Sequence, residues 1–211
     1  YLPQQAAIEL LEELACDFPP VIVSNACASG TNAIGMAFQM LRSGCAGAVI
    51  CGGYDALSRL VFAGFEALRA LSPDRCRPFD KNRSGLLLGE GAGVLCLELE
   101  SRALARGARP VVALTGYGAA TDNHHLTQPD PSGAGPYESM QNALRVAGVG
   151  PGEVDYVNAH GTATLFNDAS EGRALSELLP FARVSSTKGL TGHTLGAAGA
   201  IEGVICCMAL D

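Results

Sequence analysis

Short apolar runs rich in Val and Ile alternate with longer runs of helical apolar spacing along almost the whole chain. The apolar runs predict strands at 21–26, 46–53, 110–120, 154–159 and 182–186, and two strands joined around Gly89 and Gly91 within 86–100. The longer runs predict helices at 4–15, 27–43, 58–70, 137–148, 168–179 and 195–210. Strands that are apolar on both faces need helices on both sides of the sheet. The sequence therefore predicts a layered α/β protein.

Composition excludes several classes of protein. With 48% hydrophobic and 17% charged residues among 211, the chain has too little charge for a disordered protein. No apolar run approaches the ~18 residues of a membrane span. Fourteen basic and 21 acidic residues give a formal charge of −7, so we expect no nucleic-acid partner. The chain begins with Tyr1 and ends inside an apolar helical run, which suggests a piece of a longer protein.

The eight cysteines form no C-x-x-C pair, and most lie in apolar surroundings. This pattern opposes both a zinc site and a disulfide framework. Seven of them suit small buried side chains in a reducing compartment, which favours a cytoplasmic location. They are Cys16, Cys45, Cys51, Cys76, Cys96, Cys206 and Cys207.

Cys27 is the exception, because it lies between a predicted strand and the first turn of a predicted helix. The free N–H groups of a helix start favour a thiolate and predict a lowered pKa for this thiol. Ala28, Ser29 and Gly30 are small enough to let a substrate approach the sulfur. The Cys27 N–H could also stabilise an oxyanion. A Cys that is merely packed at a helix start is the alternative.

Two histidines occupy similar positions. His160 directly follows a predicted strand in "NAHGTAT", and His193 lies in "STKGLTGHTLGAAGA". A lone His is more often structural, but two of them at strand-to-helix turns favour a shared site at the carboxyl ends of the strands. A buried Lys188 would need a carboxylate, and we expect Glu171 to be its partner. A solvated surface pair is the alternative.

In this order and at about these separations, "NACASG", "NAHGTAT" and "SSTKGLTGHTLGAAGA" resemble the three active-site motifs of β-ketoacyl-acyl-carrier-protein synthases of the elongating type. The segment "RPFDKNRSGLLLGEGAGVLCLE" is also similar to that family. The resemblance implies a thiolase-like α/β fold, layered α/β/α/β/α with mixed sheets and incomplete in this chain. Residues 1–211 would form a partial ketosynthase domain, with the end of the N-terminal half at about 1–100 and most of the C-terminal half at about 101–211.

The resemblance also implies a chemistry. Cys27 would receive an acyl group, and His160 and His193 would hydrogen-bond the malonyl thioester during a decarboxylative Claisen condensation that extends the chain by two carbons. Supporting roles would belong to Lys188, Glu171 and Asp168. The resemblance implies no cofactor, because the substrates travel on the phosphopantetheine arm of acyl carrier protein.

Carrier protein would dock near Arg69 and Arg75. The strand "GAVICGG" would pair with a second subunit in a homodimer or a ketosynthase heterodimer. A catalytically silent chain-length partner subunit and a thiolase-like enzyme using coenzyme A are the alternatives. Asn167 stands where many family members have Gly. Together with "CRPFD" and the pair at 124–125, it is reminiscent of the aryl-polyene branch.

Overall fold

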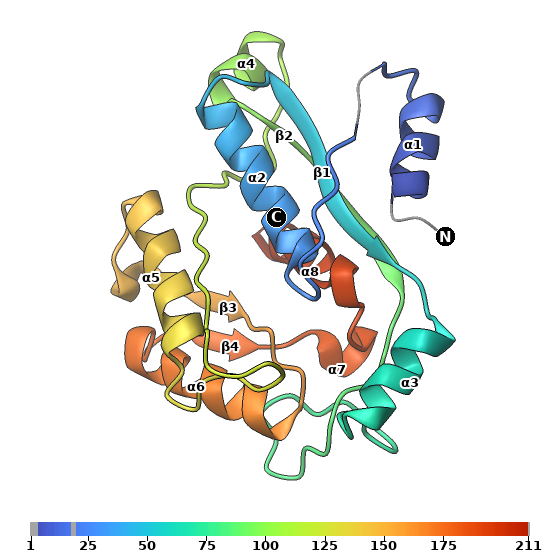
Figure 1. The fold of residues 1–211 in the computed structure, drawn as a ribbon. Coiled ribbons are helices and arrows are strands. Elements are labelled where there is room, and N and C mark those ends of the chain that lie inside the picture. The colour runs from blue at the N-terminus through green and yellow to red at the C-terminus, as the bar shows by residue number, and fades with distance from the viewer. Residues whose placement is uncertain (1–3, 18–19, 211) are drawn as a thin grey trace.

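The computed structural model describes residues 4–17 and 20–210 (Figure 1). The α-helices are α1 (Gln4–Glu13), α2 (Ser29–Arg42), α3 (Arg59–Ala67), α4 (Glu100–Ala105), α5 (Ala134–Ala147), α6 (Leu165–Leu178), α7 (Lys188–Thr191) and α8 (Ala198–Leu210). The strands are β1 (Ala48–Asp55), β2 (Gly91–Glu98), β3 (Tyr156–Asn158) and β4 (Arg183–Ser185). Short 3₁₀ turns lie at Pro151–Glu153 and Leu195–Ala197.

An antiparallel pair, β1 and β2, forms one side of the molecule, with Ala48 opposite Glu98 and Asp55 opposite Gly91. Helix α2 packs on β1, α8 packs on β2, and the two helices touch each other. Glycine makes this close approach possible. A Cβ at Gly30 would lie 2.8 Å from the Ala200 backbone nitrogen, and one at Gly93 would lie 2.7 Å from the Ala200 carbonyl carbon.

A parallel pair, β3 and β4, forms a second small sheet, with Val157 opposite Val184. Its core is a cluster of buried apolar side chains from the end of β3 and from α6, against which α5 packs. The cluster consists of Ala159, Leu175, Leu178 and Leu179. From the carboxyl end of β3 the chain passes through Ala159 to His160, so this core fixes the position of the His160 backbone.

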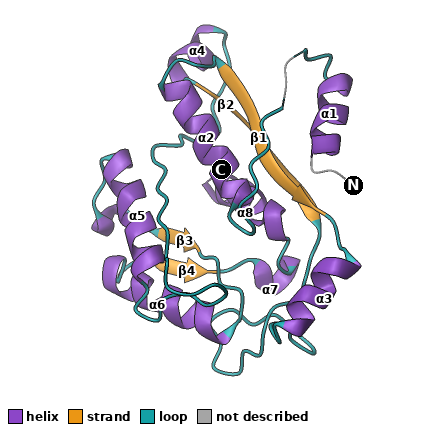
Figure 2. Cartoon of the chain, viewed as in Figure 1, coloured by secondary structure: helices purple, strands orange, loops and turns teal. Residues whose placement is uncertain are grey.

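The elements form layers (Figure 2). In this view α2 and α8 lie between the β1–β2 pair and the β3–β4 pair, and α5 and α6 lie beyond the latter. These are four of the five layers expected of a thiolase-like α/β fold. The two described sheets are one antiparallel and one parallel, which agrees with the predicted mixture of strand directions.

Three strand predictions are wrong. Residues 21–26 and 110–120 are extended or irregular, because neither segment finds a ladder partner among the described residues. The run at 86–100 gives one strand, β2, instead of two. Its first part bonds elsewhere: Leu86 bridges to Leu71, and Leu88 bridges to His193.

The chain exposes a large surface for its mass. Its accessible area is 13,154 Å² for 21.7 kDa. A compact folded monomer of that mass exposes about 9,200 Å². Large apolar side chains such as Leu60, Phe181 and Leu190 are more than four-fifths exposed.

In the part of the chain that the structure describes, no helix is long and apolar enough to cross a membrane.

Candidate active site

Cys27, His160 and His193 meet at one point, although the first and the last are 166 positions apart in the sequence. Their sulfur and ring-nitrogen atoms lie within 4.8 Å of one another. The Cys27 Sγ is 2.9 Å from the His193 Nε2, and the two imidazole centroids are 5.2 Å apart at an interplanar angle of 84°. The expected convergence of the thiol and the two imidazoles is therefore confirmed. Their catalytic roles stay predictions.

Cys27 lies in a tight turn just before α2. The preceding residue, Ala26, has a φ of 45°, which is rare for a residue with a side chain. Ser29 holds this turn, because its hydroxyl accepts a hydrogen bond from the Asn25 N–H at 2.8 Å and donates one to the Ala26 carbonyl at 2.7 Å. The turn brings the Cys27 sulfur to the edge of the helix, where it faces the His193 ring.

The His193 loop is fixed by backbone pairing. The His193 N–H donates to the Leu87 carbonyl at 2.7 Å, and the Gly89 N–H donates to the His193 carbonyl at 3.0 Å. The loop turns at Gly192, whose φ of 69° and ψ of −178° suit only glycine. The segment around Leu87 and Gly89, predicted from sequence as a strand, therefore fixes the position of the His193 backbone. His193 itself is 1% exposed.

Hydrogen bonding assigns the tautomer of His193. The Leu195 N–H donates to the His193 Nδ1 at 3.3 Å, so this nitrogen carries a lone pair. A neutral ring then carries its proton on Nε2, the nitrogen that faces Cys27. His193 thus presents an N–H donor to the site and is not arranged as a base for the thiol.

The His160 loop is held by Glu171 of α6. The Glu171 carboxylate accepts hydrogen bonds from the His160 N–H at 2.7 Å and from the Gly161 N–H at 2.8 Å. The Ser186 hydroxyl donates to the Gly161 carbonyl at 2.9 Å from the other side. Glu171 therefore holds the backbone of the His160 loop, and the supporting role that the resemblance implied for it stays a prediction.

Asp168 is a second buried acceptor on α6, with 4% of its surface exposed. Its carboxylate accepts from the Phe79 N–H at 2.7 Å and from the Ala163 N–H at 3.1 Å. Phe79 and Ala163 both have positive φ values, 61° and 63°. Asp168 thus holds two strained residues in place, one in each loop beside the site.

The predicted Lys188–Glu171 pair is wrong. Lys188, 1% exposed, forms its ion pair with Glu202 of α8. Both Glu171 oxygens are already engaged by the N–H groups of His160 and Gly161, which explains why Glu171 is not the partner. Sequence reasoning missed Glu202, although it is the one charged residue in the apolar run 195–210. That isolation was the available signal.

Burial dominates the electrostatics of the site. It lowers the pKa of His193 to about 3 and the pKa of His160 well below its ordinary value, and the Lys188 ammonium adds to both effects. Burial also raises the pKa of the Cys27 thiol, although Lys188 and the Cys27 N–H oppose the shift. The expected lowering of the Cys27 pKa is therefore wrong, because loss of water outweighs the helix start. At neutral pH the free site holds a thiol and two neutral imidazoles.

Asp55, at the end of β1, also supports the site and was missed from sequence. Its carboxylate accepts from the Gly196 N–H at 3.0 Å, just after the His193 turn.

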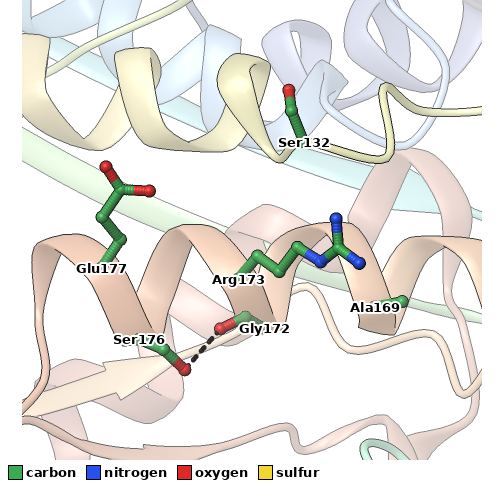
Figure 3. Close-up of a pocket in the computed structure, with 6 residues that line it drawn as sticks. All are labelled: Ser132, Ala169, Gly172, Arg173, Ser176 and Glu177. Atoms are coloured by element: carbon green, nitrogen blue, oxygen red, sulfur yellow. Dashed lines mark hydrogen bonds between the residues drawn. The ribbon is translucent and has the colours of Figure 1, made fainter.

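Among the described residues, the three converging side chains are the one cluster whose spacing could hold a metal ion. The shallow pocket of Figure 3 lies elsewhere, between Ser132 and the outer face of α6 around Arg173.

The sequence matches models of two known protein domains. Residues 13–103 match the beta-ketoacyl synthase N-terminal domain, and residues 111–211 match the beta-ketoacyl synthase C-terminal domain. The chain belongs to the beta-ketoacyl synthase family. It is 41% identical over 219 residues to a 3-oxoacyl-[acyl-carrier-protein] synthase 2 of Staphylococcus aureus, covering 99% of this chain and 54% of that protein.

Solved structures of the family share the fold. The ishigamide ketosynthase/chain length factor is similar with a TM-score of 0.92 and 40% identity, over 96% of this chain and 50% of that one. A ketosynthase complex with a type II acyl-carrier protein, AntDE:AntF, matches with a TM-score of 0.92 and 33% identity, over 96% and 53%. The predicted thiolase-like fold is confirmed. The chain spans about half the length of the relatives it matches.

Proposed function

We propose that this chain carries the reaction centre of an elongating acyltransferase, a 3-oxoacyl-acyl-carrier-protein synthase. The enzyme would condense an acyl group held on Cys27 with malonyl-acyl-carrier protein. The observation that supports this most is the cluster of a thiol and two neutral imidazoles, one of which presents its Nε2–H to the sulfur. Such a site suits nucleophilic catalysis followed by stabilisation of a developing oxyanion.

In the first step the Cys27 sulfur attacks the carbonyl of an acyl thioester on carrier protein. A new thioester forms on Cys27, and the phosphopantetheine thiol leaves with the Cys27 proton. The Lys188 ammonium favours the thiolate and opposes the effect of burial on the Cys27 pKa. The Cys27 N–H, which also favours negative charge at the sulfur, would donate to the tetrahedral oxyanion.

In the second step malonyl thioester loses carbon dioxide. The electron pair of the broken carbon–carbon bond moves into an enolate, whose oxygen would accept hydrogen bonds from His193 and His160. Low pKa values suit this role, because they keep both rings neutral at neutral pH. The N–H of a neutral ring donates a hydrogen bond to the enolate without transferring its proton. The enolate carbon then attacks the acyl carbonyl. The Cys27 thiolate leaves, and the product stays on carrier protein with two more carbons.

The partners belong to the same proposal. We expect no cofactor, because the substrates arrive on the phosphopantetheine arm. Arg69 and Arg75 are both exposed, as docking of acidic carrier protein requires. The large exposed surface and the edge of β1 that faces away from β2 support a second subunit, identical or not. A cytoplasmic location, the division near residue 100 and the aryl-polyene branch stay predictions.

A silent chain-length partner subunit would have no use for a nucleophile, and a thiolase-like enzyme would load from coenzyme A. Intact-mass measurement of the protein after incubation with acyl-carrier protein separates these possibilities. We expect one acyl group per chain in the wild type and none in Cys27→Ala. Cys45→Ala, which removes an exposed thiol, is the matched control and should load fully. Loading of Cys27→Ala, or loading from coenzyme A alone, would contradict the proposal.

A further inference from the structure

Asn167 lies between two carboxylates in the first turn of α6. Its side-chain Nδ2 is 3.1 Å from the Asp168 Oδ1 and 3.3 Å from the Glu171 Oε2. An amide nitrogen carries two hydrogens, so each carboxylate can receive one. Among the described side chains, Asn167 is the one that donates a hydrogen bond to both.

Both carboxylates hold loops of the active site. Glu171 accepts the N–H groups of His160 and Gly161, and Asp168 accepts those of Phe79 and Ala163. Four backbone donors therefore depend on two acidic groups three residues apart on one helix. Like charges at this spacing repel each other.

We propose that Asn167 is a positioning residue: its amide joins the Asp168 and Glu171 carboxylates into one acceptor cluster and thereby fixes the loop that carries His160. This inference rests on the proposed function, since His160 matters only if it acts on the thioester.

The surrounding charges show why a donor is needed here. On Glu171, burial and the Asp168 charge both raise the pKa, whereas the Asn167 amide and the two backbone N–H groups lower it. On α8, Glu202 also lies close enough to interact unfavourably with Glu171, and Lys188 is paired with Glu202. Of these two carboxylates, Arg83 pairs only with Asp168, at 3.9 Å. His160 is neutral and adds no compensating charge.

A pH dependence follows. Glu171 accepts both N–H groups most strongly as a carboxylate, so support for His160 weakens as the pH falls through the Glu171 pKa. Removing the amide raises that pKa, and the acid limb of malonyl decarboxylation should move to higher pH. A merely structural role would lower the rate equally at every pH.

The test compares pH–rate profiles of malonyl-carrier decarboxylation for the wild-type protein, Asn167→Ala and Asn167→Asp. We expect the acid limb of Asn167→Ala to move up by about 0.5–1 pH unit, the size of one net hydrogen bond. Asn167→Asp, which adds a third carboxylate, should move it further. Both should return to within about twofold of the wild-type rate above the limb. Ser176→Ala, on the same helix and bonded only to the Gly172 carbonyl, is the control and should superimpose on the wild type.

Hydrogen exchange provides a readout that does not need activity. In Asn167→Ala the amides of His160 and Gly161 should exchange several-fold faster than in Ser176→Ala. Unchanged exchange together with unshifted profiles, or a loss of rate that is the same at every pH, would overturn the inference. If Asn167→Ala exchanges faster than Ser176→Ala but the wild type does not decarboxylate malonyl-carrier protein, the proposed function fails. The contact between Asn167 and the carboxylates then still stands.

Discussion

Glu202→Ala removes the carboxylate that pairs with Lys188 and leaves an ammonium group in the interior. The Lys188 side chain is 1% exposed and the Glu202 side chain 15%, so water can hydrate neither group well. Exposed ion pairs contribute about 0–1 kcal/mol, whereas breaking a buried pair on one side costs about 3–5 kcal/mol. We therefore expect the free energy of unfolding to fall by about 3 kcal/mol or more, roughly a 150-fold change in the folding equilibrium.

Urea denaturation of the purified protein measures this loss, with Lys188→Met/Glu202→Leu as the compensated variant. The double variant removes both charges and keeps the volume, so it should regain most of the lost stability. A loss below about 1 kcal/mol in Glu202→Ala would show that water reaches the pair. A double variant as unstable as the single one would show that packing, and not an unpaired charge, explains the loss. Either result would refute the reasoning.

Three further results are expected. Gly30→Ala should lower the free energy of unfolding by about 1–3 kcal/mol, because its Cβ would lie 2.8 Å from the Ala200 backbone nitrogen. Gly64→Ala, whose Cβ would lie in open space, is the control and should not lower it. Equal denaturation midpoints for the two variants would contradict this. The unfolded chain binds a proton on His193 below pH 6.5 and the folded chain only near 3, so stability is lost on acidification between these values. His193→Gln should flatten that slope by about one proton, and an unchanged slope would refute it. Co²⁺ should not bind the thiol and two imidazoles, because the His193 Nε2 that faces Cys27 carries a proton; a charge-transfer absorption that Cys27→Ala abolishes would contradict that tautomer.

The residues of the site could be predicted from sequence because each lies next to a local signal. Cys27 and His160 follow apolar runs that lead into helices, and His193 is flanked by glycine and small residues. What brings them together is long-range packing of α2 on α8 and of β3 on α6, which no local pattern reports. The resemblance to a known family provided that step.

The errors share a physical cause. A strand exists only with a partner, and an apolar run does not say which partner it has. The runs at 21–26 and 110–120 are therefore not strands among the described residues. Likewise, Lys188 needed a buried carboxylate, but spacing could not distinguish Glu171 from Glu202. The net shift of the Cys27 pKa depends on how much water the fold removes, which sequence position does not specify.

The most direct test of the proposed chemistry separates the two steps by residue. Acyl loading is followed by intact mass and malonyl decarboxylation by release of carbon dioxide, for the wild type, Cys27→Ala and His193→Ala. We expect Cys27→Ala to lose loading completely, and His193→Ala to keep most of its loading while losing decarboxylation by at least about 100-fold, as when an oxyanion donor is removed. Equal loss of both steps in His193→Ala would contradict the division of roles between the thiol and the imidazoles.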